Sequence, residues 1–411
     1  MPSRTTPPTA AELGLMQGSR PPAERLVTLA NWQDPPFSRW AFQHFRELTP
    51  TAPIARGDGP PSELARAPRN LGGLRLTVSG GRRTTLDRLL ADTYTDGFLV
   101  LHRGAIVCER YANGMTPETL HLLQSVSKSI VGTLAGIFVS RGLLDPARPV
   151  TAYVADLAGT SFDGATVRQV LDMRTGTRFS EEYTDLRAEI RQYEQVIGWR
   201  PQTDPQTAGD LWEYICQLKN ARPHGAPFEY RSILTDLLGW VLECVGGARL
   251  AELLGRELWS RLGAERDAEI SLDGHGHPVA DGGISVTLRD LGRFGQAYLQ
   301  DGFVNGVQVV PADWVRDCRH GDDEAVAAFA ASDSAERYPH GLYRDQWWVV
   351  DRRRGVLLAS GIHGQAVYVD PPSQTVVAKL STWPEALDLR RATDTVRAFA
   401  AIAARLRRND D

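Results

Sequence analysis

Of the 46 lysines and arginines in this 411-residue chain, only three are lysines: Lys128, Lys219 and Lys379. Arginine keeps its proton in proteins, whereas a buried lysine can give one up. Lys128 ends the tetrad Ser125-Val126-Ser127-Lys128, just before an apolar run. This S-x-x-K spacing is typical of a serine nucleophile activated by a neutral lysine, whose pKa desolvation in a dry cleft would lower. A lysine that caps a helix face would give the same pattern, so the context must decide.

The residues that follow predict a buried helix. Apolar side chains recur at helical spacing from Ile130 to Phe138, and Arg141-Gly142 is typical of a helix end. Ser125 and Lys128 are three residues apart, so they share one helix face. The serine falls on the first turn, where free N–H groups and the helix dipole favour developing negative charge.

A second element about 100 residues downstream completes a catalytic set. Tyr230-Arg231-Ser232 immediately precedes a strong amphipathic stripe that begins at Ile233. A Tyr-x-Ser at a loop-to-helix junction can project a phenol and a hydroxyl into a cleft. A tyrosine in this place is usually core or rim, but beside the S-x-x-K we interpret Tyr230 as functional.

The charge composition indicates which classes of partner to expect. The net charge is −4, and the longest run of like charge is Arg352-Arg353-Arg354, which precedes Gly355 and predicts a hairpin tip. We therefore expect neither a nucleic acid nor a membrane partner. The first residues lack an apolar signal region, and four widely spaced cysteines match no metal or redox motif. These features favour a cytoplasmic protein without a metal, and they leave the choice between a monomer and a homodimer open.

The order of expected elements predicts an α+β fold. Apolar runs on either side of Arg103-Gly104 indicate a β-hairpin, and strands return between 347 and 380. The region between them is mostly helical, and a last helix is expected over about 393–405. We expect one antiparallel sheet flanked by helices with an inserted helical subdomain. The predicted units are an arm and connecting segment (1–72), a sheet domain (73–149 and 266–411) and the helical subdomain (150–265).

Together these motifs resemble the serine β-lactamase and penicillin-recognising clan, over about 95–385. That clan combines S-x-x-K, Tyr-x-Asn or Tyr-x-Ser, and a Lys-Thr-Gly-like strand. Here the third motif reads Ala359-Ser360-Gly361-Ile362, so the lysine that would bind a β-lactam carboxylate is missing. The resemblance therefore implies an esterase or amidase rather than a β-lactamase or carboxypeptidase.

A narrower resemblance spans almost the whole chain. The segments 32–36, 39–42, 125–129, 346–348 and 361–365 are similar to the 6-aminohexanoate-dimer hydrolases, which cleave nylon oligomers. The resemblance implies that Ser125 is the nucleophile and that Lys128 and Tyr230 move its proton. It places the oxyanion hole at the N–H groups of Ser125 and Ile362. The other implied positions are Tyr183 at the scissile amide, Trp348 in the acyl pocket, and Glu194 and Asp281 facing the substrate.

Several of these residues have simpler interpretations. Tyr183 could be an exposed loop residue, and Glu194 could belong to a solvated helix face. His363 is best read as a satisfied histidine at a strand end. Trp347 and Trp348 alternate on a strand, so one should face the core and the other the cleft. His275 and His277 lack a third ligand nearby, which makes a zinc site improbable.

We therefore predict a serine hydrolase that cleaves the amide of 6-aminohexanoate dimers and short esters through an acyl-enzyme, without a cofactor. Two alternatives remain open: a carboxylesterase with little amidase activity, and a non-catalytic binding module on the same scaffold.

Overall fold

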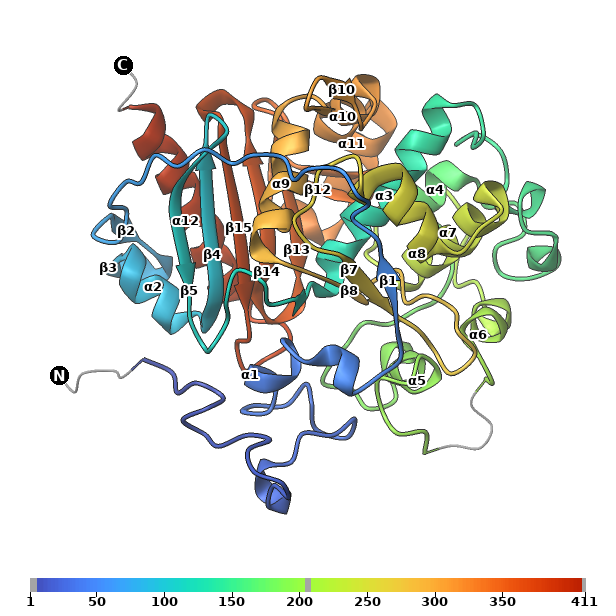
Figure 1. The fold of residues 1–411 in the computed structure, drawn as a ribbon. Helices are drawn as coiled ribbons and strands as arrows, with labels where there is room; N and C mark the ends of the chain where they lie inside the picture. Colours follow the sequence, from blue (N-terminus) through green and yellow to red (C-terminus); the bar gives the residue numbers. More distant parts are fainter. Residues whose placement is uncertain (1–5, 204–207, 409–411) are drawn as a thin grey trace.

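The computed structural model describes residues 6–203 and 208–408 (Figure 1). Its centre is a seven-stranded antiparallel sheet in the order β11-β12-β13-β14-β15-β4-β5. The strands are β4 (Thr95–His102), β5 (Ala105–Tyr111), β11 (Leu342–Arg344), β12 (Trp347–Asp351), β13 (Val356–Gly361), β14 (Gln365–Asp370) and β15 (Thr375–Ser381). The predicted hairpin about Arg103-Gly104 joins β4 to β5, and the arginine triplet lies in the turn between β12 and β13. Both predictions are confirmed.

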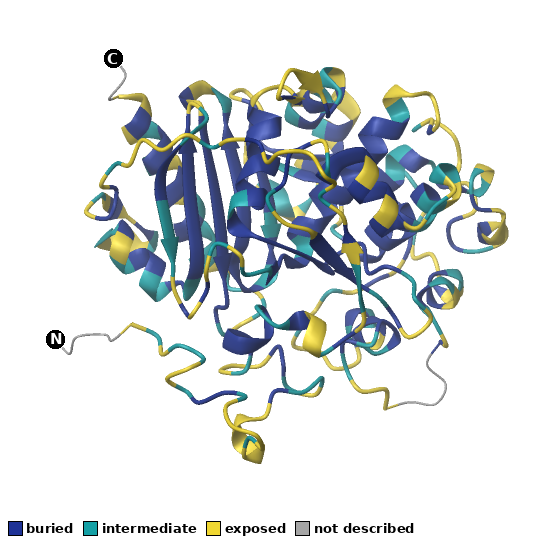
Figure 2. Ribbon diagram, viewed as in Figure 1, coloured by how far each residue is buried: buried dark blue, intermediate teal, exposed yellow. Residues whose placement is uncertain are grey.

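Helices cover both faces of this sheet. On one face, α9 (Leu288–Leu299) lies so close that a Cβ added at Gly292 would come within 2.4 Å of Leu99 on β4. On the other face, Phe399 of α12 (Leu389–Arg407) packs against Tyr368 of β14 with ring centroids 5.6 Å apart. Strands β14 and β15 are buried throughout and β4 is buried in all but its first residue, as the dark blue of Figure 2 shows for β4 and β15. The sheet is therefore the central layer of the molecule, with α9 packed on one face and α12 on the other.

The helical region lies to one side of the sheet and begins with the helix after the S-x-x-K (Figure 1). It contains α3 (Ser127–Ser140), α4 (Val167–Leu171), α5 (Glu189–Val196), α6 (Leu211–Gln217), α7 (Ile233–Gly246), α8 (Leu250–Leu254) and a π-helical turn (Gly255–Trp259). The buried face of α7 carries the predicted stripe of Ile233, Leu237 and Val241. This arrangement is an α+β fold of the kind the sequence predicts.

A smaller antiparallel sheet, β1-β7-β8-β6, connects the two regions. Its strands are β1 (Thr51–Ile54), β6 (His121–Leu122), β7 (Ala268–Ser271) and β8 (Ile284–Val286). The remaining elements are α1 (Ser38–Ala41), α2 (Leu86–Asp92), α10 (Ala312–His320), α11 (Asp323–Ala330) and the two-stranded pairs β2–β3 (Arg75–Thr77, Arg83–Thr85) and β9–β10 (Phe303–Val304, Val307–Gln308). None of the helices in the described ranges combines the length and hydropathy that a bilayer span requires.

The N-terminal segment is more integrated than the predicted arm. It supplies β1 to the smaller sheet, and Trp32 is buried with its indole N–H donating to the carbonyl of Trp199 at 2.7 Å. Within this segment α1 ends at Ala41, and a separate 3₁₀ turn covers Phe45–Glu47. Large aromatic side chains thus fasten this segment to the helical region.

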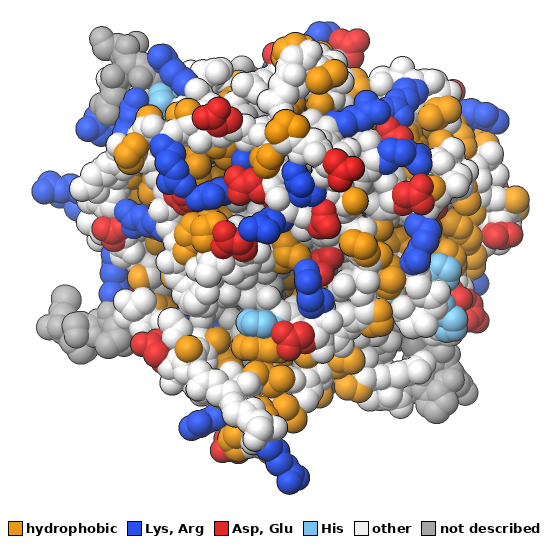
Figure 3. Space-filling view, viewed as in Figure 1, with side chains coloured by type: hydrophobic (Ala, Val, Ile, Leu, Met, Phe, Trp, Pro, Cys, Tyr) orange, Lys and Arg blue, Asp and Glu red, His pale blue; other side chains and the backbone are white. Residues whose placement is uncertain are grey.

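On the molecular face drawn in Figure 3, basic and acidic side chains are intermixed rather than gathered by sign. The three lysines behave differently from the arginines. Lys219 is exposed, whereas Lys128 and Lys379 are each 1% exposed. The scarcity of lysine therefore does mark two buried amines.

Candidate active site

Ser125 lies at the start of the helical region, where the chain leaves the smaller sheet. It sits in a 3₁₀ turn (Gln124–Val126) that runs directly into α3, so the nucleophile precedes the helix by two residues. Lys128, in the first turn of α3, donates from Nζ to Ser125 Oγ at 2.9 Å. Gln124 has a positive φ of 49°, a sparsely populated conformation that is often found at functional sites. The S-x-x-K residues are thus in direct contact.

Tyr230 meets this pair from the loop before α7. Its hydroxyl is close enough to Ser125 and Lys128 for both side chains to lower its pKa. Its ring lies 5.3 Å from Lys128 Nζ and stacks on Trp348 with centroids 5.4 Å apart. Burial raises the pKa of Tyr230, although the charge of Lys128 opposes the rise. The structure therefore brings together the three residues expected to handle the proton.

The charge of Lys128 differs from the sequence prediction. Burial disfavours the ammonium, but the acidic groups around it, with Tyr230 and Asp281 the strongest, outweigh the burial and raise the pKa of Lys128. Nζ also donates to the carbonyl oxygen of Asp281 at 2.8 Å and lies 3.4 Å from its Oδ2. The expectation of a neutral resting lysine is wrong for this structure, because acidic partners from distant segments surround the amine.

The backbone next to Ser125 provides a place for an oxyanion. Ile362 follows β13 directly, in a tight turn where His363 has a φ of 57°. A Cβ added at the preceding Gly361 would stand 3.1 Å from the Ser125 nitrogen, so β13 and the nucleophile turn are in close contact. Within the described part of the chain, neither the Ser125 nor the Ile362 amide donates to a backbone acceptor. Both N–H groups are thus free to bind a developing negative charge.

Ser125 opens into a largely apolar cavity of about 250 Å³. Trp348, on β12, forms one wall together with Tyr230 and Tyr338, and Trp347 points the other way and is fully buried. The prediction that one tryptophan faces the core and the other the cleft is confirmed. Ile362, Trp383 and Leu387 line the remaining wall. Trp348 and Ser125 thus line the same cavity.

A second cavity, of about 430 Å³, shares part of its wall with the first. Glu181, Tyr183, Ala386 and Leu387 border both. Tyr183 is half-buried there, with Arg191 5.6 Å from its ring centroid, so the alternative of an exposed loop residue is wrong. Charged and polar residues dominate the second cavity: Gln33, Asp34, Glu182, Arg191, Arg200, His363 and Glu385.

Sequence reasoning missed Glu181. Its carboxylate accepts a hydrogen bond from the backbone N–H of Ser232, and the Tyr183 hydroxyl lies 3.5 Å from its other oxygen. Burial raises the pKa of Glu181, whereas the Lys128 charge lowers it. The acidic pair Glu181-Glu182 directly before Tyr183 was the available signal, but which carboxylate turns inward depends on the fold.

Two residues expected to face the substrate lie behind the cavity walls. Glu194 is 3% exposed, and its carboxylate pairs with Arg191 at 2.7 Å and Arg200 at 2.5 Å and accepts from Gln33 at 3.0 Å. Glu194 is therefore neither a solvated residue nor a free carboxylate. Asp281 is 6% exposed, contacts Lys128 and lines neither cavity. Neither placement supports direct contact of these carboxylates with substrate.

The histidines do not form a metal site. His363 is buried, its Nδ1 bonds to the carbonyl of Trp383 at 2.8 Å, and burial lowers its pKa to about 4. Its Nε2 has no hydrogen-bond partner among the described residues, so the expected satisfied histidine is only half satisfied. Across residues 6–203 and 208–408, no three His, Cys, Asp or Glu side chains group as metal ligands would.

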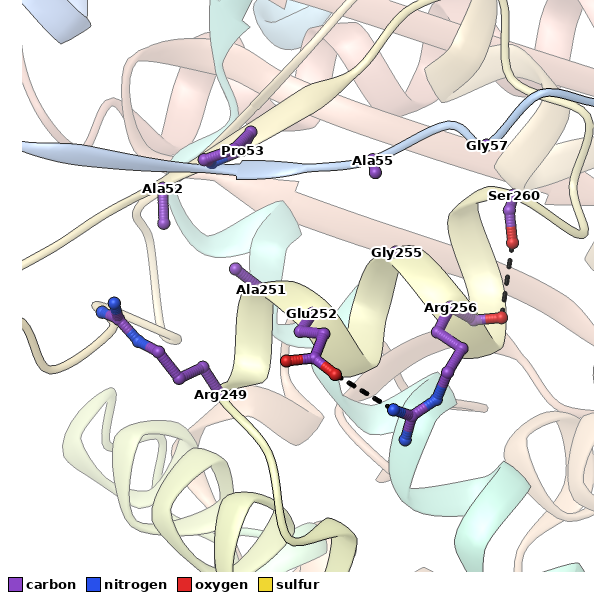
Figure 4. A pocket seen from close by; sticks show the side chains of 10 residues that line it. All are labelled: Ala52, Pro53, Ala55, Gly57, Arg249, Ala251, Glu252, Gly255, Arg256 and Ser260. Carbon is purple, nitrogen blue, oxygen red and sulfur yellow. Dashed lines mark hydrogen bonds and ion pairs between the residues drawn. The ribbon is translucent and has the colours of Figure 1, made fainter.

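A larger hollow elsewhere lacks catalytic groups. It measures about 450 Å³ and lies between β1 and α8 with its π-helical extension (Figure 4). Small residues such as Ala52 and Gly255 line it, and two of its charged side chains, Arg256 and Glu252, pair with each other at 3.2 Å. The chemistry of this protein therefore centres on Ser125.

Comparison with known proteins agrees with this geometry. The Beta-lactamase family model matches residues 83–402. The 6-aminohexanoate-dimer hydrolase of Paenarthrobacter ureafaciens is 39% identical over 383 residues, which cover 90% of this chain and 95% of the relative. A solved structure from Bacillus anthracis, provisionally named a 6-aminohexanoate-dimer hydrolase, superposes with a TM-score of 0.86 at 26% identity, covering 95% of this chain and 99% of its own.

More distant structures share the fold. One is EstCE1, a hydrolase with promiscuous acyltransferase activity, with a TM-score of 0.60 at 16% identity over 77% of this chain and 96% of its own. The matches to the family model and to the curated relative each cover most of the chain. This serine hydrolase therefore belongs to the 6-aminohexanoate-dimer hydrolases of the β-lactamase family.

Proposed function

We propose that the protein hydrolyses the amide bond of linear 6-aminohexanoate dimers, and short esters, through an acyl-enzyme on Ser125. The observation that carries the proposal is the contact of Ser125 with both Lys128 and Tyr230 at the mouth of the Trp348 cavity. A serine held between two proton-handling groups and facing an apolar pocket has the parts that nucleophilic acyl transfer needs.

In the resting enzyme both Lys128 and Tyr230 are protonated, so neither can accept the proton of Ser125. Lys128 is an ammonium that donates to Ser125, and Tyr230 is a neutral phenol. The reactive form is the pair after loss of one proton, with the phenolate of Tyr230 stabilised by the adjacent ammonium. Because the two groups are coupled, the titration belongs to the pair rather than to either residue.

In the reactive form, Tyr230 takes the proton of Ser125 as Oγ attacks the substrate carbonyl. The amides of Ser125 and Ile362 bind the resulting oxyanion. Tyr230 then returns the proton to the leaving nitrogen or oxygen, and Tyr183 orients the leaving amine. Water repeats the sequence on the acyl-enzyme and releases the acid.

The two adjoining cavities suit a long substrate with polar ends. A methylene chain packs against Trp348, whereas a charged end reaches the second cavity past Tyr183. That cavity holds more carboxylates than guanidiniums in its wall, and Glu194 behind the wall offsets one of the two positive charges of Arg191 and Arg200. An ammonium end is therefore favoured, and we assign Glu194 an indirect role through the two arginines.

One comparison of rates tests the proposal. The purified protein is assayed on the 6-aminohexanoate dimer, by release of amine, and on p-nitrophenyl acetate, with Ser125→Ala as the matched control. Turnover of both substrates that vanishes in the variant, with a fluorophosphonate label on Ser125, supports the proposal. Ester turnover alone would identify a carboxylesterase instead, and no labelling at Ser125 would indicate a non-catalytic binding module.

A further inference from the structure

Behind Lys128 lies a buried row of groups that the proposed chemistry does not use. Asp281 contacts Lys128, Tyr193 of α5 contacts Asp281, and Asp236 of α7 contacts Tyr193. Asp236 is fully buried, Tyr193 is 1% exposed and Asp281 is 6% exposed. The row therefore runs from the catalytic amine into the interior of the helical region.

The hydroxyl of Tyr193 lies between two carboxyl groups. Its oxygen is 2.7 Å from Asp281 Oδ1 and 2.8 Å from Asp236 Oδ2. A phenol carries one hydrogen, so it can donate to only one of them. If both carboxyl groups were ionised, the one that receives no hydrogen bond would face a lone pair of the phenol oxygen in a site without water, which is unfavourable. One of the two carboxyl groups must therefore hold a proton and donate it to Tyr193.

The surrounding contacts identify which carboxyl group that is. Asp281 has the Lys128 ammonium 3.4 Å from Oδ2, which stabilises its ionised form. Asp236 Oδ1 accepts the backbone N–H groups of Ala280 at 2.8 Å and of Asp281 at 3.1 Å, which leaves Oδ2 to face Tyr193. Burial and the neighbouring Asp281 charge raise the pKa of Asp236 well above its usual range. Burial likewise raises the pKa of Tyr193, which keeps it a neutral phenol.

We propose that Asp236 is protonated in the resting enzyme, and that Asp236 and Tyr193 are positioning residues that hold ionised Asp281 beneath Lys128 and so set the proton content of the Lys128–Tyr230 pair. The proton on Asp236 Oδ2 points to Tyr193, and the Tyr193 proton points to Asp281 Oδ1. This inference rests on the proposed function, since it concerns the proton supply of that same site.

The groups that face Lys128 define the expected pH dependence. Asp281 and Asp236 face it from behind, Glu181 from the loop before α5, and Tyr230 from the cavity side. The negative charge of Asp281 favours the fully protonated pair, so it moves the acid limb of kcat/KM to higher pH. A carboxylate this close to a cation shifts such a titration by about 1–3 pH units.

Conservative substitutions separate the two carboxyl groups. Asp281→Asn should lower the acid limb on p-nitrophenyl acetate by about 1–3 pH units, because the charge next to Lys128 is lost. Asp236→Asn mimics a protonated carboxyl, because its amide can donate to Tyr193 while its oxygen accepts the same two backbone N–H groups. The acid limb should therefore stay at the wild-type pH. Asp236→Ala removes these contacts and should impair activity. Activity that is lost in Asp236→Ala but retained in Asp236→Asn would show that the native Asp236 acts as a neutral, protonated group rather than as a charged carboxylate.

Two outcomes would overturn the inference. The first is a shift of the acid limb of kcat/KM in Asp236→Asn that is as large as the shift in Asp281→Asn, since Asp236 would then be ionised in the native protein. The other is an Asp281→Asn limb that does not move. Infrared difference spectroscopy needs no turnover: the protonated-carboxyl band should be present in the wild type and reduced in Asp236→Asn. If that band is found but no substrate is hydrolysed, the proposed function fails while the protonated Asp236 stands.

Discussion

Gly361→Ala offers a direct test of the oxyanion site. Gly361 has extended backbone angles, φ −127° and ψ 152°, which alanine adopts without strain. The added methyl group would nevertheless stand 2.6 Å from the Leu123 carbonyl oxygen and 3.1 Å from the Ser125 nitrogen. An ordinary carbon–oxygen contact is about 3.3 Å, so the strand end must retreat by roughly 0.7 Å. That retreat would carry the Ile362 amide away from Ser125.

The expected cost follows from the geometry of an oxyanion hole. Its donors act at about 2.7–3.1 Å, and a retreat of roughly 0.7 Å takes one of them beyond useful range. Loss of one donor typically lowers kcat about 10²–10³-fold, or about 2.7–4 kcal/mol. We expect this loss in kcat on p-nitrophenyl acetate, with little change in KM, because the donor acts on the transition state.

The control is Gly73→Ala, the same change at an exposed glycine with nothing within 4 Å of the new methyl group. Overpacking at Gly361 can cost about 1–3 kcal/mol of stability, so circular dichroism must show that the variant is folded at the assay temperature. A folded Gly361→Ala enzyme whose kcat stays within about threefold of the wild type would refute the assignment of Ile362 to the oxyanion hole.

Four further substitutions test the other roles. Ser125→Ala should abolish turnover of both substrates in a folded protein, and more than about a tenth of the wild-type rate would contradict the nucleophile assignment. Lys128→Arg should be nearly as inactive as Lys128→Ala in initial-rate assays, because the planar guanidinium cannot take the place of the compact ammonium between Ser125 and Tyr230; substantial activity would show that a positive charge suffices whatever its shape. Tyr183→Phe should depress amide turnover far more than ester turnover, whereas equal losses would indicate a packing role. Glu194→Ala should lower the free energy of unfolding by about 3–5 kcal/mol in denaturant titrations, because Arg191 loses its buried partner; it should also raise KM for the amino-ended dimer, and an unchanged KM would remove Glu194 from specificity.

Local motifs were sufficient to predict the centre of the site. The S-x-x-K and the Tyr-x-Ser each place their residues on a single turn, and the structure brings Ser125, Lys128 and Tyr230 into contact. The sheet was predictable for a similar reason, because its hairpins have short turns and strongly apolar strands. The last helix begins at Leu389 rather than near 393, because Asp388 caps it by accepting from the Arg391 N–H at 2.8 Å.

Electrostatic properties were not predictable in the same way. The charge of Lys128 depends on Asp281, 153 residues away, and the position of Glu181 depends on the Ser232 amide, 51 residues away. Sequence spacing predicts which side chains share a turn, but it does not predict which distant segments face them. The assignments of Glu194 and Asp281 came from alignment alone, and their buried ion pairs became visible only in three dimensions.

The burial of two lysines has a practical consequence for handling the protein. Lys128 and Lys379 are each 1% exposed, so Lys219 is the one lysine side chain that a bulky amine-reactive reagent can reach in the folded state. A dye or a solid support coupled through succinimidyl esters would therefore attach at Lys219 or at the α-amino group. Lys219 follows α6 in the helical region and lines neither of the two cavities at Ser125 and Tyr183. Immobilised preparations should thus present at most two orientations, and limited digestion with a lysine-specific protease should begin at the peptide bond after Lys219.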